Sequence, residues 1–165
     1  LEDLLSDLGE YYLPRKLELG PVDIKELLLE IKSMLRVTCQ KKNIEITTEF
    51  EKTAGPVKGD PARLKQVFLN LVKNAIEATE QDGHIHLEVK KIGDKIRIRV
   101  ADDGPGISIE DQAKIFSPFF TTKSHGSGLG LCVTKRIIDE HPGGSITVFS
   151  KEGEGTTFEV ILPSF

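Results

Sequence analysis

The chain has 165 residues, of which 38% are hydrophobic and 29% charged, a balance typical of one soluble globular domain. The net charge of −4, without a dense basic stretch, disfavours nucleic-acid binding, and no apolar run reaches the length of a membrane span. Cys39 and Cys132 lie far apart and predict reduced thiols, so we expect a cytoplasmic domain. The first residue is not methionine, and we expect a fragment of a longer protein.

Apolar periodicity and turn residues predict the following elements in chain order. They are helices over 1–12 and from 23 to about 35, a strand over 44–50, a turn-rich stretch over 54–61, a helix over 60–80, strands over 84–90 and 95–102, a short helical stretch near 109–116, a helix over 127–140, and strands over 144–150 and 156–162. Asp23 and Glu26 make a capping-box pattern at the second helix. The order predicts an α+β fold, a two-layer sandwich in which about three helices cover one face of a mixed sheet of about five strands.

The predicted helix over 60–80 carries polar residues beside its apolar face. Asn70, Asn74 and Glu77 lie close together on the helix surface. Asparagine is a poor residue for helix interiors, so two of them one turn apart favour a site over amides that only satisfy nearby backbone groups. An amide oxygen suits Mg²⁺ that already carries phosphate oxygens. For Glu77 we prefer a solvated helix carboxylate.

The sequence VADDGPGI over 100–107 places two carboxylates at the end of a strand, before Gly-Pro-Gly. These residue types also form ordinary turns. A carboxylate here can instead accept a hydrogen bond from the exocyclic amine of a nucleobase, while glycines let a flat ring approach the backbone. It can also bind Mg²⁺. The motif alone leaves all three interpretations open.

The sequence HGSGLGL over 125–131 leads into the predicted helix over 127–140. Its glycine spacing fits neither a P-loop nor a Rossmann loop. Backbone N–H groups at a glycine-rich helix start favour an anion, and the same glycines allow a hinge. We interpret residues 121–127 as a mobile lid in which Lys123 can meet a phosphate, and we expect this lid to be poorly ordered without nucleotide. His125 is interpreted as a lid residue, because no second metal ligand stands at a fixed spacing.

The ordered motifs NLVKNA, DDGPGI, KIFSPFF, GSGLGL and GEGTTF resemble those of the ATP-binding domain of sensor histidine kinases. That domain shares its fold with gyrase, heat-shock chaperone and mismatch-repair ATPases. The resemblance covers about residues 22–163 and implies a Bergerat-type fold that takes ATP and Mg²⁺. The TTK and PFF surroundings are similar to nitrogen-regulator-type and PAS-linked kinases. The resemblance also implies that residues 1–21 end a dimerisation and phosphoacceptor helix plus linker, and that 22–165 form the catalytic domain.

The resemblance assigns roles to individual residues. Asn74 would coordinate Mg²⁺, Asn70 would stand one turn before it, and Asp102 would bind the adenine amino group. Phe119 and Phe120 fall in the phenylalanine box, and Gly155 falls in the last glycine box. The other ATP-binding residues that it implies are Lys73, Gly104, Gly106, Ile107, Phe116, Thr121, Thr122, Lys123, Gly126, Ser127, Gly128, Leu129, Gly130, Leu131 and Thr156.

Two departures from the family pattern matter for the chemistry. Many of these kinases carry Lys or Arg at the position of Glu77, so here a phosphate contact must come from elsewhere, either Lys73 or Lys123. The related ATPases carry a water-activating glutamate at the position of Asn70. An amide cannot take a proton from water, which predicts slow hydrolysis and transfer of the phosphoryl group to another nucleophile. Catalysis would then rest on positioning and charge stabilisation.

The expected nucleophile is a histidine, but none of the four histidines here lies on an amphipathic helix beside an acid; they are His84, His86, His125 and His141. We therefore expect the chain to bind Mg-ATP and to phosphorylate a histidine of the upstream dimerisation domain, for relay to a cognate response regulator. A homodimer could form through the first helix. Three alternatives remain: an anti-sigma-type protein serine kinase, an ATPase that Asn70 disfavours, and a nucleotide-sensing module without catalysis.

Overall fold

The structure, a computed structural model, describes residues 5, 8–9 and 16–165. Residues 5, 8 and 9 are helical, and the rest of the helix predicted over 1–12 lies outside the described residues. Within the described part of the chain, no helix combines the length and the apolar character needed to cross a bilayer.

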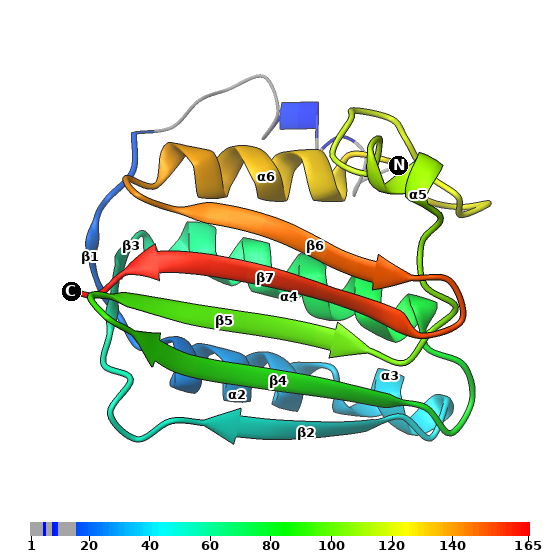
Figure 1. The fold of residues 1–165 in the computed structure, drawn as a ribbon, viewed down its shortest axis with the longest axis horizontal. Coiled ribbons are helices and arrows are strands. Elements are labelled where there is room, and N and C mark those ends of the chain that lie inside the picture. The colour runs from blue at the N-terminus through cyan, green and yellow to red at the C-terminus, as the bar shows by residue number, and fades with distance from the viewer. Residues whose placement is uncertain (1–4, 6–7, 10–15) are drawn as a thin grey trace.

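The described residues form a twisted sheet of five strands in the spatial order β2-β4-β5-β7-β6 (Figure 1). The strands are β2 (Glu45–Phe50), β4 (His84–Ile92), β5 (Lys95–Asp102), β6 (Ser145–Lys151) and β7 (Gly155–Pro163). β2 runs parallel to β4 and the other neighbours are antiparallel, so the sheet is mixed as predicted. The register places Asp102 at the end of β5 directly opposite Thr156 at the start of β7.

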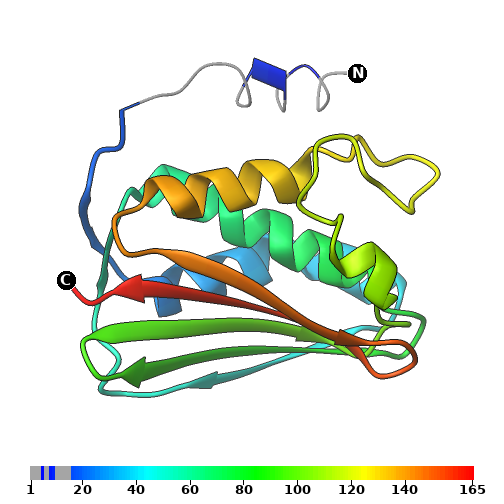
Figure 2. The same cartoon turned by 45° about the horizontal axis from the view of Figure 1, so that its top comes forward.

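Helices α2 (Ile24–Met34), α4 (Pro61–Ala78) and α6 (Gly130–Glu140) cover one face of this sheet (Figure 2). Two shorter helices, α3 (Arg36–Lys41) and α5 (Ile109–Gln112), follow α2 and β5. α5 ends earlier than the stretch predicted near 109–116, and turns replace its second half. Asp23 caps α2 as expected, since its Oδ1 accepts from the backbone N–H groups of Lys25 and Glu26. The three helices on one face of a five-stranded mixed sheet confirm the predicted α+β class.

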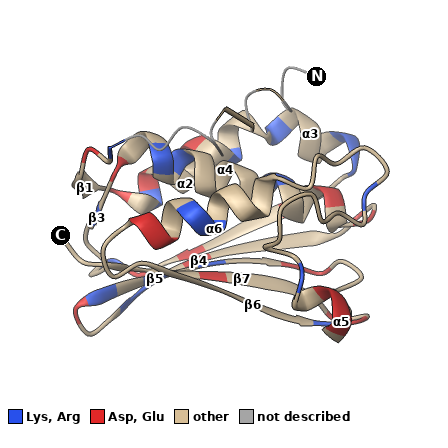
Figure 3. Cartoon of the chain, turned by 90° about the horizontal axis from the view of Figure 1, so that it is seen from above, with Lys and Arg blue, Asp and Glu red and all other residues tan. Residues whose placement is uncertain are grey.

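α4 is the central helix of the helical layer. Its side chains Leu64, Phe68 and Leu71 are fully buried, and burial of each contributes about 1.5–3 kcal/mol. The helix packs on α2, α6 and β5, so most of its circumference is covered and its orientation is fixed. Asn70 and Asn74 are half-buried beside this core, while Lys73 and Glu77 are the exposed residues in the second half of the helix. Charged residues of both signs occupy the outer surfaces of α2 and α6 (Figure 3).

A small ribbon of β1 (Gly20–Val22) and β3 (Val57–Gly59) was not predicted. Each strand has three residues, too few for an alternating pattern, and β3 lies within the predicted turn-rich stretch. The backbone N–H of Glu18 donates to Asp60 Oδ2 at 2.9 Å, which ties the segment before β1 to the start of α4. The division of the chain at residue 21 stays a prediction.

Candidate functional site

The predicted site residues come from elements that meet at one end of the molecule. α4 contributes Asn70 and Asn74, the end of β5 contributes Asp102, and the start of α6 contributes Gly130. The segment between α5 and α6 stands beside the N-terminal end of α6 and the C-terminal half of α4 (Figure 2). Residues far apart in sequence are therefore brought to one place by the packing of α4 between β5 and α6.

Asp102 is a half-buried carboxylate without an ion-pair partner among the described residues. Its Oδ1 accepts from the backbone N–H of Gly104 at 2.9 Å. Burial raises the pKa of Asp102 above its ordinary value, although hydrogen bonds from the backbone N–H groups of Gly104 and Thr156 oppose this. A carboxylate in this setting is a strong acceptor for a donor that enters the site.

The glycines near Asp102 allow backbone segments to approach closely. A Cβ at Gly155, where φ is +92°, would lie 2.0 Å from the carbonyl oxygen of Asp102. A Cβ at Gly104 would lie 2.6 Å from the carbonyl oxygen of Ala78, at the end of α4. A Cβ at Gly106, where φ is +74°, would lie 2.1 Å from the carbonyl oxygen of Lys151. These positions therefore exclude side chains and let the backbone segments around Asp102 pack closely together.

Asn70 joins α4 to the start of α6. Its Nδ2 donates to Thr134 Oγ1 at 2.9 Å, and Thr134 is buried. A Cβ at Gly130 would lie 2.6 Å from Asn70 Oδ1, so only glycine lets the first turn of α6 come this close to the amide. The arrangement places an amide oxygen beside the backbone N–H groups that open α6, where a helix favours an anion.

Asn74 faces the lid, residues 121–127. Its Oδ1 accepts from Lys123 Nζ at 3.1 Å, and Lys123 Nζ also forms an ion pair with Glu77. Of the two lysines proposed for a phosphate contact, Lys123 reaches Asn74. Lys73 is exposed, and its ammonium group makes no hydrogen bond or ion pair with another described residue.

The lid is anchored at both ends in the core. Phe116 packs edge-on against Phe158, with ring centroids 6.4 Å apart, and Phe120 is partly buried against the core. Leu129 is fully buried, so its side chain fixes the lid rather than lining an open site. Phe119 is exposed and has a positive φ of 64°, and it lies against Gly128, which has a φ of +71°. Between these anchors Thr121, Thr122, Lys123 and Gly126 are exposed.

Sequence reasoning missed Ser150 on β6. Its hydroxyl accepts from the Ile107 N–H at 2.8 Å, donates to the Gly155 carbonyl at 2.9 Å, and lies 2.8 Å from Thr156 Oγ1. Gln112 Nε2 donates to the carbonyl oxygens of Ile107 and Ser150. These bonds hold the glycine loop and the start of β7 together. A serine on an alternating strand gives no such signal, because its partners are distant in sequence.

Lys42 was also missed. Its Nζ donates to the carbonyl oxygens of Ile76 at 3.0 Å, Glu77 at 3.4 Å and Thr79 at 2.9 Å, and so caps the C-terminal end of α4 from outside the helix. Thr134 had a usable signal, since a buried threonine stands one turn after Gly130 on the apolar face of α6.

The donor set fits a nucleotide whose metal arrives with it. Among the described residues, no three His, Cys, Asp or Glu side chains cluster to hold a metal ion by themselves. Asn74 Oδ1 already faces a cation, the ammonium group of Lys123. Asn74 Oδ1 is thus a neutral oxygen that lies against a positive charge. Such an oxygen suits a Mg²⁺ ion whose other ligands are phosphate oxygens and water.

Comparison with known proteins gives a consistent result. Residues 59–164 match the family described as histidine kinase-, DNA gyrase B-, and HSP90-like ATPase. Sensor histidine kinase ZraS of Escherichia coli (strain K12) is 38% identical over 163 residues, which are 99% of this chain and 35% of ZraS. The chain therefore spans about a third of the length of that relative.

Solved structures agree in fold. The catalytic domain of histidine kinase ThkA has a TM-score of 0.81 at 40% identity, covering 89% of this chain and 96% of that one. ThkA in complex with response regulator protein TrrA has a TM-score of 0.86 at 35% identity, covering 99% and 47%. Full-length ShkA in complex with AMPPNP has a TM-score of 0.87 at 30% identity, covering 98% and 35%.

Proposed function

The chain belongs to the family of histidine kinase-, DNA gyrase B- and HSP90-like ATPases as a catalytic ATP-binding domain of the histidine-kinase type, and from this we propose that it binds Mg-ATP and transfers the γ-phosphate to a histidine outside residues 1–165. The observation that carries the proposal is Asp102, a half-buried carboxylate that no cationic side chain of the described residues pairs with, beside glycines where a Cβ would collide with backbone.

In this proposal Asp102 accepts a hydrogen bond from the exocyclic amine of adenine. Oδ1 is already fixed by the Gly104 N–H, so the carboxylate is oriented before the base arrives. Gly104 and Gly106 carry no side chain that would stand between the flat ring and the backbone. The hydroxyl of Thr156, which is buried and bonded to Ser150, lies on the strand directly opposite Asp102 and completes this end of the site.

At the phosphate end, Asn74 would hold Mg²⁺ through its amide oxygen, with Asn70 one turn before it. When bound, Mg²⁺ neutralises charge that develops on the phosphate oxygens. The backbone N–H groups at the start of α6 and the ammonium group of Lys123 face the same region and favour anions. The lid hinge at Gly126 and Gly128 would let residues 121–127 close over the nucleotide.

The chemistry that these residues support is transfer rather than hydrolysis. Asn70 is an amide whose Nδ2 donates to Thr134 Oγ1. An amide is too weak a base to take a proton from water. An imidazole nitrogen of the acceptor would instead attack the γ-phosphorus; the P–N bond forms as the bond to the ADP oxygen breaks, and ADP leaves. His141 is unsuitable as acceptor because it is buried and both ring nitrogens are engaged, by Asp60 N–H and the Ile137 carbonyl.

The relatives support a proposal about the partners of the whole protein. ThkA is seen with a response regulator, and ZraS is named a sensor histidine kinase. We infer that this domain acts with an upstream dimerisation and phosphoacceptor domain of the same protein and a cognate response regulator. A cytoplasmic location and dimerisation through the N-terminal helix belong to the same proposal.

The decisive experiment measures Mg-ATP binding by titration calorimetry and phosphoryl transfer to the upstream helical domain. Asp102→Asn and Asn74→Ala should each weaken Mg-ATP binding by about tenfold or more, because a charge-assisted hydrogen bond or a metal ligand is lost. Labelled ATP should phosphorylate the upstream domain and leave the isolated chain unlabelled.

Asp103→Asn is the matched control, since Asp103 is the adjacent carboxylate but is exposed and bonded to His84. It should leave binding unchanged. Equal effects of the Asp102 and Asp103 variants would refute the adenine assignment, and stable labelling of the isolated chain would refute transfer to an outside histidine.

A further inference from the structure

One ammonium group joins the lid to α4. Lys123 Nζ donates to Asn74 Oδ1 at 3.1 Å and pairs with Glu77, which lies on α4 just beyond Asn74. The side chain of Lys123 is 41% exposed and that of Glu77 is 51% exposed. An ion pair so accessible to water is weak and exchanges readily, so it can be rearranged at little cost when a ligand enters.

Glu77 is the fixed partner in this pair. Its carbonyl and those of Ile76 and Thr79 accept from Lys42 Nζ, which holds the last turn of α4 in place. Lys123, in contrast, lies on a loop, where its backbone N–H bonds to Thr121 Oγ1 at 3.0 Å. Glu77 is therefore held in place by the helix, whereas the loop allows Lys123 to move.

The contact with Asn74 must change when nucleotide binds. Asn74 Oδ1 is the atom proposed to face Mg²⁺, and two cations at one oxygen repel each other strongly. Lys123 would then leave Asn74, and both Glu77 and the terminal phosphates of the nucleotide would offer it a negative charge. The carboxylate of Glu77 keeps the ammonium group within the site during this exchange.

We propose that Glu77 is a positioning residue, which holds Lys123 at the phosphate end of the site both before and after Mg-ATP binds. This inference rests on the proposed function, because the phosphates are those of the nucleotide. It assigns to an acidic side chain on α4 a favourable role in binding an anionic ligand, and this role depends entirely on the lysine opposite.

A double-mutant cycle tests the dependence. The affinities of the 165-residue chain for Mg-ATP and Mg-ADP are measured by calorimetry for wild type, Glu77→Gln, Lys123→Met and the double variant. Lys123→Met should lower the preference for ATP over ADP about tenfold, because a charge-assisted contact to the terminal phosphate is lost. Glu77→Gln should lower it about two- to fivefold in the wild-type background and not at all in the Lys123→Met background.

A second readout needs no nucleotide. Amide hydrogen exchange of residues 121–127 should accelerate in Glu77→Gln, because the lid loses its tether to α4. Lys65→Met is the matched control, since Lys65 is a lysine of the same helix whose ammonium group pairs with Glu30 of α2 at 2.7 Å and not with the lid. It should change neither the nucleotide preference nor lid exchange.

The outcomes separate the two proposals. The inference is overturned if Glu77→Gln lowers the ATP preference by the same factor in both backgrounds, or if Lys123→Met leaves that preference unchanged while binding still depends on Asp102. If the wild-type chain does not bind Mg-ATP, or binds it independently of Asp102, the proposed function itself fails.

Discussion

At the scale of single residues, Asp102 is the clearest conflict between stability and function. The fold partly buries this side chain, no cationic side chain of the described residues pairs with it, and burial raises its pKa. For a carboxyl group whose pKa is raised in the folded state, the ionised form is penalised by folding. The penalty is present above the folded pKa and disappears as the pH falls below the unfolded pKa. At neutral pH Asp102 therefore destabilises the fold that it serves.

Asp102→Asn is thus expected to act in opposite directions on binding and stability. The amide oxygen can still accept from the Gly104 N–H, and the desolvation penalty of the charge is removed. The midpoint of urea unfolding at pH 7 should stay the same or rise, while Mg-ATP affinity falls. Under acidic conditions, below the unfolded pKa, the part of the stability difference that comes from the charge of Asp102 should vanish. A clear loss of stability at pH 7 would show that Asp102 is a structural residue.

At the scale of elements, the site depends on how α4 ends. Asp60 caps its N-terminus through a hydrogen bond from Arg63 N–H. Burial tends to raise the pKa of Asp60, but hydrogen bonds from the backbone N–H groups of Glu18, Arg63 and Ala62 outweigh it and the net pKa is lowered. The C-terminus is held by Lys42, and the Ala78 carbonyl there lies against Gly104. The last turn of α4 therefore sets the position of the glycine loop that follows Asp102.

Lys42→Met should loosen that last turn. The carbonyls of Ile76, Glu77 and Thr79 lose a charged donor, which should lower the free energy of unfolding by about 1–2 kcal/mol and weaken Mg-ATP binding as well. Thermal unfolding and calorimetry measure the two effects. The neighbouring exposed Lys41 gives the control variant Lys41→Met, and similar losses in both variants would contradict a capping role.

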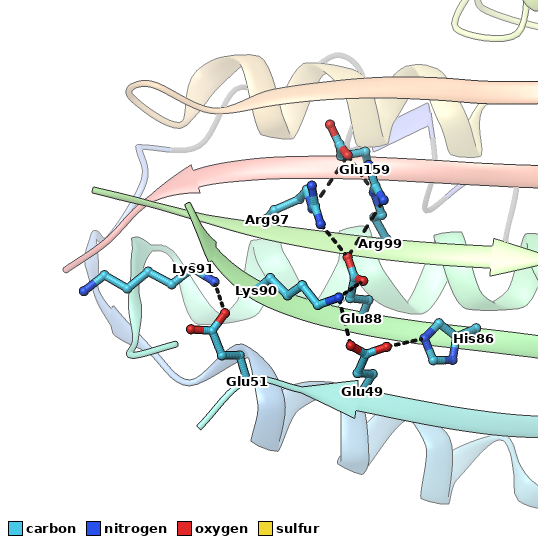
Figure 4. A network of polar contacts seen from close by, with 9 residues as sticks. All are labelled: Glu49, Glu51, His86, Glu88, Lys90, Lys91, Arg97, Arg99 and Glu159. Atoms are coloured by element: carbon cyan, nitrogen blue, oxygen red, sulfur yellow. Dashed lines mark hydrogen bonds and ion pairs between the residues drawn. The ribbon is translucent and has the colours of Figure 1, made fainter. Parts of the chain in front are cut away.

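At the scale of the whole molecule, the two faces of the sheet are held by different forces. One face packs apolar side chains against the helices, and the other carries a network of charged side chains across β2, β4, β5 and β7 (Figure 4). Glu88 lies at its centre, buried, with Lys90 Nζ at 2.7 Å and Arg97 Nη2 at 3.0 Å. Glu159 binds Arg99 Nε at 2.7 Å. The network ties neighbouring strands together on the face that the helices leave open.

Glu88→Gln is expected to lower the free energy of unfolding, because it removes a charge from the network on this face. Burial raises the pKa of Glu88, but the hydrogen bonds and charges of Lys90 and Arg97 outweigh it and the net pKa is lowered. A lowered carboxyl pKa contributes stability above the unfolded pKa, and this stability is lost as the pH falls through the folded pKa. The variant should lose roughly 1–3 kcal/mol of unfolding free energy at pH 7. Its acid limb, the fall in unfolding free energy as the pH drops, should be less steep than that of wild type.

Chemical unfolding across the acid range measures this effect. Glu154→Gln is the matched control, because Glu154 is 63% exposed and pairs only with Lys151 at the surface, and it should change stability little. An acid limb as steep in Glu88→Gln as in wild type would contradict the role of the network.

Much of the fold could be predicted because the signals are local. The stripe of α4 and the alternation of β4 and β5 report burial on one face, and Asp23 and Glu26 report a cap within one turn. β1 and β3 could not be predicted, since three residues give no period and their pairing spans more than thirty residues of sequence. The roles of Lys42 and Ser150 are likewise long-range, and no local pattern encodes them. The assignment of individual side chains to nucleotide, and the mobility of the lid, stay predictions.

The sequence by itself determined the kinds of groups available: two amides on one helix face, a carboxylate at a strand end, and glycines where side chains would collide. These follow from residue type and spacing, which are local properties of the sequence. Only the tertiary structure decided which groups meet. It set Lys123 rather than Lys73 beside Asn74, gave Glu77 a cationic partner, and left Asp102 half buried without one. Contacts between α4, the lid and β5 depend on how distant segments pack, and their energies arise only once water has been excluded from between them.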